Sequence, residues 1–194
     1  MSTLQRVCVY CASSRQCDTA FHDGARQVGA ALAGGGLTVV YGGGAVGSMG
    51  ALADGALAAG GRVIGVLPRF MQELEWGHPA IPLQIVADMH ERKRTMLELS
   101  QAVVALPGGC GTWEELLEAM AWKRLGLWNG PIVILNQDGF YDPLIQLLAR
   151  AIHDRFMDPR HRALWSAVPT ADEVVPALLG APAWAEDARS FAVP

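Results

Sequence analysis

The sequence Pro-Gly-Gly-Cys-Gly-Thr-Trp-Glu-Glu at positions 107–115 contains the residue types needed to bind an anion and to act on it. An apolar run over residues 102–106 precedes it and predicts a buried strand. Glycines let the backbone approach a ligand closely, and the free N–H groups at the start of a helix bind phosphate. Thr112 is predicted to cap a helix whose first turn carries Glu114 and Glu115. The segment therefore indicates a phosphate-binding turn beside a carboxylate, and chemistry on a phosphorylated small molecule.

Glu115 has two interpretations that the local pattern leaves open. Thr112 and Glu115 have the spacing of a capping box, in which both side chains satisfy backbone N–H groups. A catalytic carboxylate is an equally good interpretation, and both can hold, because a carboxylate in a first helical turn stays ionised near the helix dipole. An ionised carboxylate beside a phosphate can stabilise a developing oxocarbenium ion or activate a water.

A basic segment comes one predicted element earlier in the chain. Asp88 is expected to begin a helix in which Arg92 and Lys93 share a face with Met89 and Met96. A solvated basic face is one interpretation of this pattern. The other is a role directed at an anion, because the cations lie on a partly apolar stripe and precede the glycine turn.

Three glycines after the second apolar run, Gly42, Gly44 and Gly47, have the spacing G-x-G-x-x-G. A dinucleotide site also needs an acidic residue about 20 positions later to bind the ribose. The next predicted strand ends at residues 65–69 without a carboxylate, and the motif follows the second strand rather than the first. A tight turn or a wall facing a nucleotide is therefore preferred over an NAD site.

The whole chain alternates short apolar runs with longer helical patterns, which predicts an α/β fold: an open parallel sheet with helices on both faces. Residues 1–180 are expected to form a single Rossmann-like domain, residues 68–82 a loop or short helix near the cleft, and residues 181–194 a loose C-terminal tail. The predicted strands are 6–10, 37–41, 62–67, 84–87, 102–106 and 131–135, and the predicted helices are 19–33, 48–59, 88–99, 112–125, 141–155 and 171–179.

Ligands of such sheets bind at the carboxyl ends of the strands. Three polar or glycine-rich turns are expected there, and they can converge on one crevice. They place Ser13, Gly43 and Gly44 beside the turn at 107–112 as candidate substrate-binding residues.

Composition limits the possible partners and locations. The 194 residues carry a net charge of −4, which argues against a nucleic acid held by bulk electrostatics. No segment approaches the roughly 18 apolar residues of a membrane span, and no signal peptide is evident, so a cytoplasmic protein is expected. Cys8 and Cys11 have C-x-x-C spacing, but residues three apart on a strand face opposite sides, so neither a metal nor a redox site is expected.

Several spaced motifs, in order, resemble the lonely guy (LOG) family of cytokinin riboside 5′-monophosphate phosphoribohydrolases. Residues 107–115 match its PGGxGTxxE signature, and the resemblance covers about residues 5–156. Three further stretches agree: Val40–Gly50, Asp88–Lys93 and Cys11–Ser14. Older descriptions of such proteins as lysine decarboxylases are not supported by the family's chemistry.

The resemblance implies hydrolysis of the N-glycosidic bond of N6-modified adenosine monophosphates, with AMP itself a plausible substrate. It implies a homodimer that acts on a small nucleoside monophosphate and needs no metal and no cofactor. Arg92 and Glu115 correspond to the family's catalytic pair, and a further substrate-binding carboxylate corresponds to Glu75, with Glu73 as the alternative. The remaining implied substrate-binding residues are Lys93, Gly109, Cys110, Gly111, Thr112, Trp113 and Glu114.

This chain departs from the family pattern at two places. It has Ala12-Ser-Ser-Arg-Gln16 where relatives often have Gly-Ser-Ser-x-Gly, and Ala121 where many have Thr. The lost hydroxyl leaves the preferred base open. The rival hypothesis from another class is a non-catalytic carrier of a nucleotide or of molybdenum cofactor. Such a carrier needs the glycine turn but not the carboxylate of Glu115.

Overall fold

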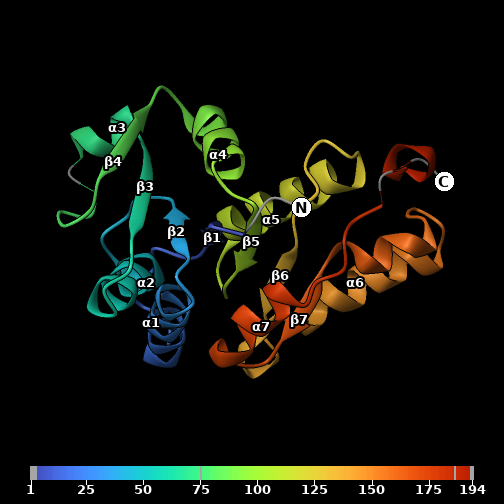
Figure 1. The fold of residues 1–194 in the computed structure, drawn as a ribbon, viewed down its shortest axis with the longest axis horizontal. Coiled ribbons are helices and arrows are strands. Elements are labelled where there is room, and N and C mark those ends of the chain that lie inside the picture. Colours follow the sequence, from blue (N-terminus) through green and yellow to red (C-terminus); the bar gives the residue numbers. More distant parts are fainter. Residues whose placement is uncertain (1–3, 75, 186, 193–194) are drawn as a thin grey trace.

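A seven-stranded parallel sheet forms the centre of the structure (Figure 1). The computed structural model describes residues 4–74, 76–185 and 187–192. The strand order is β4-β3-β2-β1-β5-β6-β7. The strands are β1 (Arg6–Tyr10), β2 (Thr38–Tyr41), β3 (Val63–Pro68), β4 (Leu83–Val86), β5 (Ala102–Ala105), β6 (Ile132–Leu135) and β7 (Ser166–Val168).

Helices cover both faces of the sheet and create two hydrophobic cores. Val7 and Val9 of β1 pack into the core under α1, α2 and α7, whereas Cys8 and Tyr10 pack into the core under α4, α5 and α6. This alternation follows from the pleat of a strand, and it explains why the central strands are apolar throughout. The helices are α1 (Thr19–Gly34), α2 (Gly47–Ala58), α3 (Arg69–Glu73), α4 (Met89–Glu98), α5 (Cys110–Arg124), α6 (Asp142–His153) and α7 (Val174–Leu179).

The predicted fold class is confirmed. All six predicted strands and the first five predicted helices are present, with ends within two residues of the predicted ones. The predicted C-terminal helix is a 3₁₀ turn, η3 (Ala171–Glu173), followed by α7. Two elements were not predicted from the sequence: β7, a three-residue strand at the edge of the sheet, and the 3₁₀ helix η2 (Pro159–Leu164).

The prediction of a loose tail was wrong for residues 188–191. These residues form the 3₁₀ helix η4, and Phe191 is buried. Its ring packs against the rings of His161 and Trp184, so apolar contacts fix this part of the chain.

The strand order determines where the loops meet. From β1 the chain runs outward through β2 and β3 to β4, and it then returns to place β5 on the other side of β1 (Figure 1). The loops that follow β1 and β5 therefore run in opposite directions from the carboxyl ends of these neighbouring strands. Open α/β sheets bind ligands at such a position. Within the described residues, no helix is both long enough and apolar enough to cross a membrane.

Candidate active site

The buried guanidinium of Arg92 connects three elements at this edge of the sheet. Arg92 lies in the first turn of α4, which Asp88 caps by accepting hydrogen bonds from two backbone N–H groups. Its Nε donates to the carbonyl of Val66 on β3 at 3.1 Å, and its Nη2 donates to the carbonyl of Gly42 at 3.0 Å. Its Nη1 lies 3.4 Å from Oε1 of Glu115 on α5. Its position is thus fixed by two carbonyls at strand ends and one carboxylate.

Gly42 is required for this arrangement. A Cβ atom at position 42 would lie 1.7 Å from Nη2 of Arg92, so any other residue would displace the guanidinium. The hydroxyl of Tyr41 donates to the carbonyl of Gly44 at 3.0 Å and holds the turn that follows β2. Gly42, in the turn that the sequence predicts, therefore positions the arginine.

Glu115 is the buried acidic partner in this pair. Only 6% of the residue is exposed, and burial raises the pKa of its carboxyl to about 7, although the charge of Arg92 acts in the opposite direction. The prediction that a first-turn position near the helix dipole keeps this group ionised does not hold, because Glu115 lies in the second turn of α5 and its pKa is raised. Near neutral pH the carboxyl can both bind and release a proton.

The predicted capping box is also absent. Helix α5 begins at Cys110, two residues earlier than predicted, with Gly109 at the capping position and no side-chain cap. Thr112 is therefore the third helical residue, and Glu115 lies in the second turn. Of the two interpretations of Glu115, the cap is excluded.

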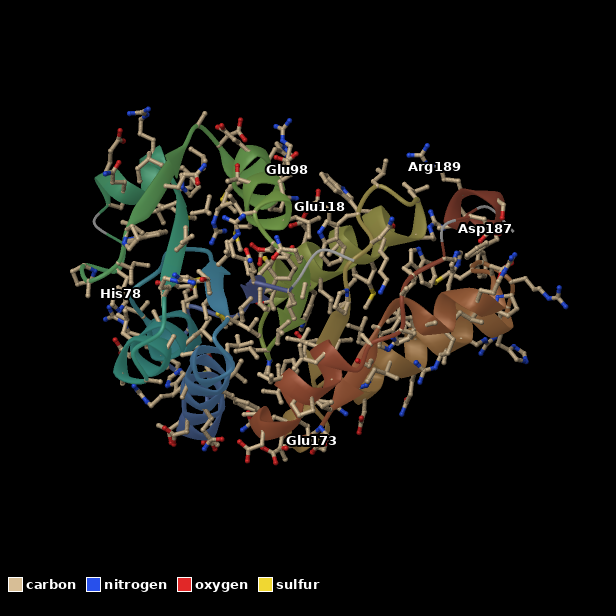
Figure 2. All side chains as sticks on the ribbon, in the orientation of Figure 1. His78, Glu98, Glu118, Glu173, Asp187 and Arg189 are labelled. Carbon is tan, nitrogen blue, oxygen red and sulfur yellow. The ribbon has the colours of Figure 1, made fainter. Side chains whose placement is uncertain are left out.

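Lys93 lies next to this pair and binds two carboxylates of α5. Its Nζ forms an ion pair with Glu114 and lies 3.3 Å from Oε1 of Glu118, which projects from α5 toward α4 (Figure 2). Burial lowers the pKa of Lys93, but these carboxylates raise it more, so the net shift is upward. The basic face predicted on this helix is therefore buried, and its Arg92 and Lys93 are paired with carboxylates of α5. The structure confirms Met96 on it but leaves Met89 exposed.

The phosphate-binding turn predicted from the sequence contains two kinds of glycine. A Cβ at Gly108 would lie 2.3 Å from Oγ1 of Thr112, so this glycine is needed for packing. A Cβ at Gly109 or Gly111 would meet nothing within 4 Å, so these glycines face open space. The first N–H groups of α5 lack partners within the helix and are available to an anion. The hydroxyl of Tyr141 fixes the preceding carbonyl, that of Leu106, at 2.7 Å.

A cavity of about 690 Å³ opens beside Arg92. The loop after β1 supplies its polar wall, which includes the predicted residue Ser13, and the turn after β2 supplies Gly44. Its other wall is apolar and contains side chains that the sequence analysis did not identify. The lining residues are Ser13, Ser14, Arg15, Gln16, Gly42, Gly44, Ala45, Val46, Met49, Leu67, Met71, Trp76 and Arg92.

Other predicted binding residues lie outside the lining of this cavity. Gly43 is buried with φ +77°, accepts a hydrogen bond from the N–H of His78, and lies outside the cavity wall. Glu73, the alternative carboxylate, is exposed at the end of α3. Glu75 lies outside the described residues. Cys110, Trp113 and Glu114 are exposed along α5, whereas Thr112 is buried.

The missed residues left little signal in the sequence. The carbonyls of Val66 and Gly42 belong to the backbone, so no residue type indicates them. Glu118 could have been found, because it lies four residues after Glu114 on the same helix face. In the described part of the chain, no group of three or more His, Cys, Asp or Glu residues is placed to hold a metal ion.

The parallel sheet and its glycine turns place this protein in the Rossmann-like α/β class. The family described as "possible lysine decarboxylase" matches residues 49–178. A probable cytokinin riboside 5′-monophosphate phosphoribohydrolase of Oryza sativa subsp. japonica is 42% identical over 171 residues, covering 88% of this chain and 77% of that one. A cytokinin riboside 5′-monophosphate phosphoribohydrolase of Arabidopsis thaliana is 41% identical over 175 residues, covering 90% and 77%. The chain belongs to the LOG family.

Solved structures show the same fold at lower identity. The molybdenum cofactor binding protein of Rippkaea orientalis superposes with a TM-score of 0.69 at 20% identity, over 92% of this chain and 98% of that one. The molybdenum cofactor carrier protein of Chlamydomonas reinhardtii gives 0.69 at 21% identity, over 91% and 98%. At these identities the likeness concerns the fold alone.

Proposed function

We propose that this protein hydrolyses the N-glycosidic bond of adenosine 5′-monophosphates, including N6-modified ones, to the free base and ribose 5-phosphate. The observation that carries the proposal is the buried pair of Arg92 and Glu115, in which Arg92 lines the cavity and Glu115 lies behind it on α5. The names of the relatives, phosphoribohydrolases acting on cytokinin riboside monophosphates, support the same reaction.

The 5′-phosphate binds at the start of α5, where the backbone N–H groups of Gly109, Cys110 and Gly111 and the positive end of the helix dipole suit a dianion. Glu115 lies five residues after Cys110, about 7.5 Å along the helix axis. This separation suits a carboxylate that acts at the ribose C1′ while the phosphate stays at the helix start. Binding energy from the phosphate then holds the ribose in place while the bond breaks.

In the reaction, the bond between C1′ and the base nitrogen breaks, and its electron pair leaves with the base. The ionised carboxylate of Glu115 stabilises the positive charge that develops on the ribosyl group, or accepts a proton from the attacking water. The water oxygen bonds to C1′, and the proton it releases ends on the departing base. Arg92 holds the carboxylate in position and assists departure of the base.

The test is release of free base from AMP and from isopentenyladenosine monophosphate by the pure protein in metal-free buffer. Wild type should release base and ribose 5-phosphate in equal amounts, and Glu115→Gln should not. No release from either nucleotide would contradict the proposal. Equal nucleotide affinity in wild type and Glu115→Gln, without turnover in either, would instead identify a carrier.

The enzyme acts as a homodimer in the cytoplasm, without a metal or nicotinamide cofactor. Trp113 and Leu117 support the dimer, because these exposed apolar side chains lie one turn apart on α5. Sedimentation analysis of wild type and Leu117→Glu tests this assignment. A monomeric wild type would contradict it.

A further inference from the structure

A second cavity, of about 280 Å³, lies at the other end of α5. It is far from the glycine turn, because Lys123 is thirteen residues after Cys110, about 20 Å along the helix. The cavity lies between the start of β6, the segment joining η2 to β7, and the end of α7. Its lining residues are Lys123, Pro131, Ile132, Ala163, Leu164, Trp165, Ser166, Ala177, Gly180, Ala181 and Pro182.

Among the described residues, Lys123 is the only charged one that lines this cavity. It is 4% exposed, its Nζ donates to the carbonyl of Leu164 at 2.9 Å, and the Nζ lies 5.3 Å from the centroid of the Trp184 ring. Within the described part of the chain, no carboxylate lies within ion-pair distance of this ammonium. An ammonium group has three N–H donors, and here one carbonyl satisfies only one of them.

This position is electrostatically incomplete. A buried charge without a counterion is costly, and burial accordingly lowers the pKa of Lys123 to about 8. The other buried lysine, Lys93, has two carboxylate partners. Lys123 lacks such a partner among the described residues and lines a cavity, into which an anionic ligand can enter.

The cavity walls define the kind of anion. Apart from Lys123, the hydroxyl of Ser166 and the indole N–H of Trp165, which is unpaired within the described residues, the lining side chains are apolar, with Ile132 and the carbon atoms of the Trp165 ring among them. A phosphate needs several converging donors, whereas a single cation on an apolar wall suits one carboxylate joined to an apolar body. The volume lies just below the usual range for ligand pockets, so the ligand is small.

We propose that this cavity binds a small apolar monocarboxylate, such as a medium-chain or aromatic acid. The carboxylate pairs with Nζ of Lys123, and the apolar part packs against Trp165 and Ile132. The site is separate from the proposed nucleotide site, and its ligand does not enter the hydrolytic reaction.

Hexanoate is a suitable probe, measured at pH 7 by calorimetry and by tryptophan fluorescence. Wild type should bind it saturably, and Lys123→Met should bind it at least tenfold more weakly. Hexanol, which lacks the charge, should bind wild type and Lys123→Met with the same low affinity. Arg124→Gln is the matched control: it removes the neighbouring cation, which does not line the cavity, and should leave hexanoate affinity unchanged.

Two further variants locate the site. Ala177→Leu fills the cavity while keeping Lys123 and should abolish hexanoate binding, and Trp165→Phe should remove the fluorescence change. Near-ultraviolet circular dichroism verifies that each variant is folded. Equal hexanoate affinity in wild type and Lys123→Met, or no saturable binding by folded wild type, would overturn the proposal. Because the readout is binding, failure here is distinct from failure of the proposed hydrolase activity.

Discussion

Arg92 and Glu115 meet across the gap between α4 and α5, with Nη1 and Oε1 3.4 Å apart and both side chains almost fully buried. The two groups have opposite effects on the same proton. Burial raises the pKa of Glu115, and the guanidinium of Arg92 lowers it. Because the net pKa is about 7, the ionised carboxylate that the proposed mechanism requires exists only near and above neutral pH.

The first prediction is therefore the pH dependence of the activity. A carboxyl whose pKa is raised to about 7 is protonated, and inactive in the proposed role, below that pH. The kcat/KM for AMP should fall about tenfold for each pH unit below 7 and reach a plateau above it. The phosphate of the substrate also titrates, near pH 6, so inhibition by ribose 5-phosphate over the same range provides the control. A profile that is flat through pH 7 would contradict the assigned role of Glu115.

The second prediction concerns Arg92→Lys. Lysine keeps the positive charge but lacks the planar guanidinium, whose separate N–H groups bind two carbonyls and the carboxylate of Glu115 at the same time. We expect kcat to fall by about 100-fold or more, and the midpoint of the remaining activity to move above pH 7, because the carboxylate loses its close partner. The matched control is Arg94→Lys on the exposed side of α4, which should leave both quantities unchanged. An unchanged midpoint in Arg92→Lys would show that the guanidinium does not tune Glu115.

How far the sequence alone predicted the site depends on whether side chains or backbone form each part. The glycine turn at 107–112 could be predicted from residue types at fixed spacings. The pairing of Arg92 with Glu115 was expected from the resemblance to the family, because their local patterns also fitted a solvated face and a helix cap. The carbonyls of Val66 and Gly42 have no residue-specific signature, so only the sheet topology reveals them. The fold class was predictable because strands covered on both faces are apolar throughout. The short edge strand β7 has only three residues, too few to show such a pattern.

The capping box failed for a physical reason. Thr112 and Glu115 have the required spacing, but Gly109 takes the capping position with an extended backbone, φ −89° and ψ −162°. The helix therefore starts two residues earlier than predicted, so that Thr112 is its third residue and Glu115 lies in its second turn. The start of α5 depends on the backbone conformation of the turn after β5, and the spacing of Thr112 and Glu115 does not determine that conformation. The crevice and the segment 68–82 near it were predicted, but the side chains of Met71 and Trp76 in its lining were not, because that segment has no periodic pattern.

The third prediction tests whether Gly42, in the turn after β2, positions the guanidinium of Arg92. In Gly42→Ala, the added methyl group would overlap Nη2 of Arg92, whose position then has to change. Activity should fall about as far as in Arg92→Lys, with the same upward shift of the pH midpoint. Gly36→Ala is a control for general effects of replacing a glycine: an added Cβ there would meet no atom within 4 Å, although the φ of +72° makes some loss of stability expected. A fully active Gly42→Ala would contradict the positioning role.

The last prediction concerns the 5′-phosphate and the open glycines that are proposed to bind it. If the start of α5 binds the phosphate, AMP should be cleaved far faster than adenosine. The loss of two or three charge-assisted hydrogen bonds should raise the activation free energy for adenosine by about several kcal/mol. Gly111→Val should reduce the cleavage of AMP toward that of adenosine, because the added side chain occupies the space of the phosphate. Its Cβ meets no atom of the chain within 4 Å, so the melting temperature should change little.

Two matched variants separate ligand exclusion from structural damage. Gly108→Val should instead unfold or rearrange the turn, because its Cβ would collide with Thr112, and Cys110→Ser should leave both stability and activity nearly unchanged. Steady-state kinetics with AMP and adenosine, together with thermal unfolding, measures all of these effects. Equal rates for AMP and adenosine in wild type would mean that the glycine turn does not anchor a phosphate, and Glu115 would then need a different substrate.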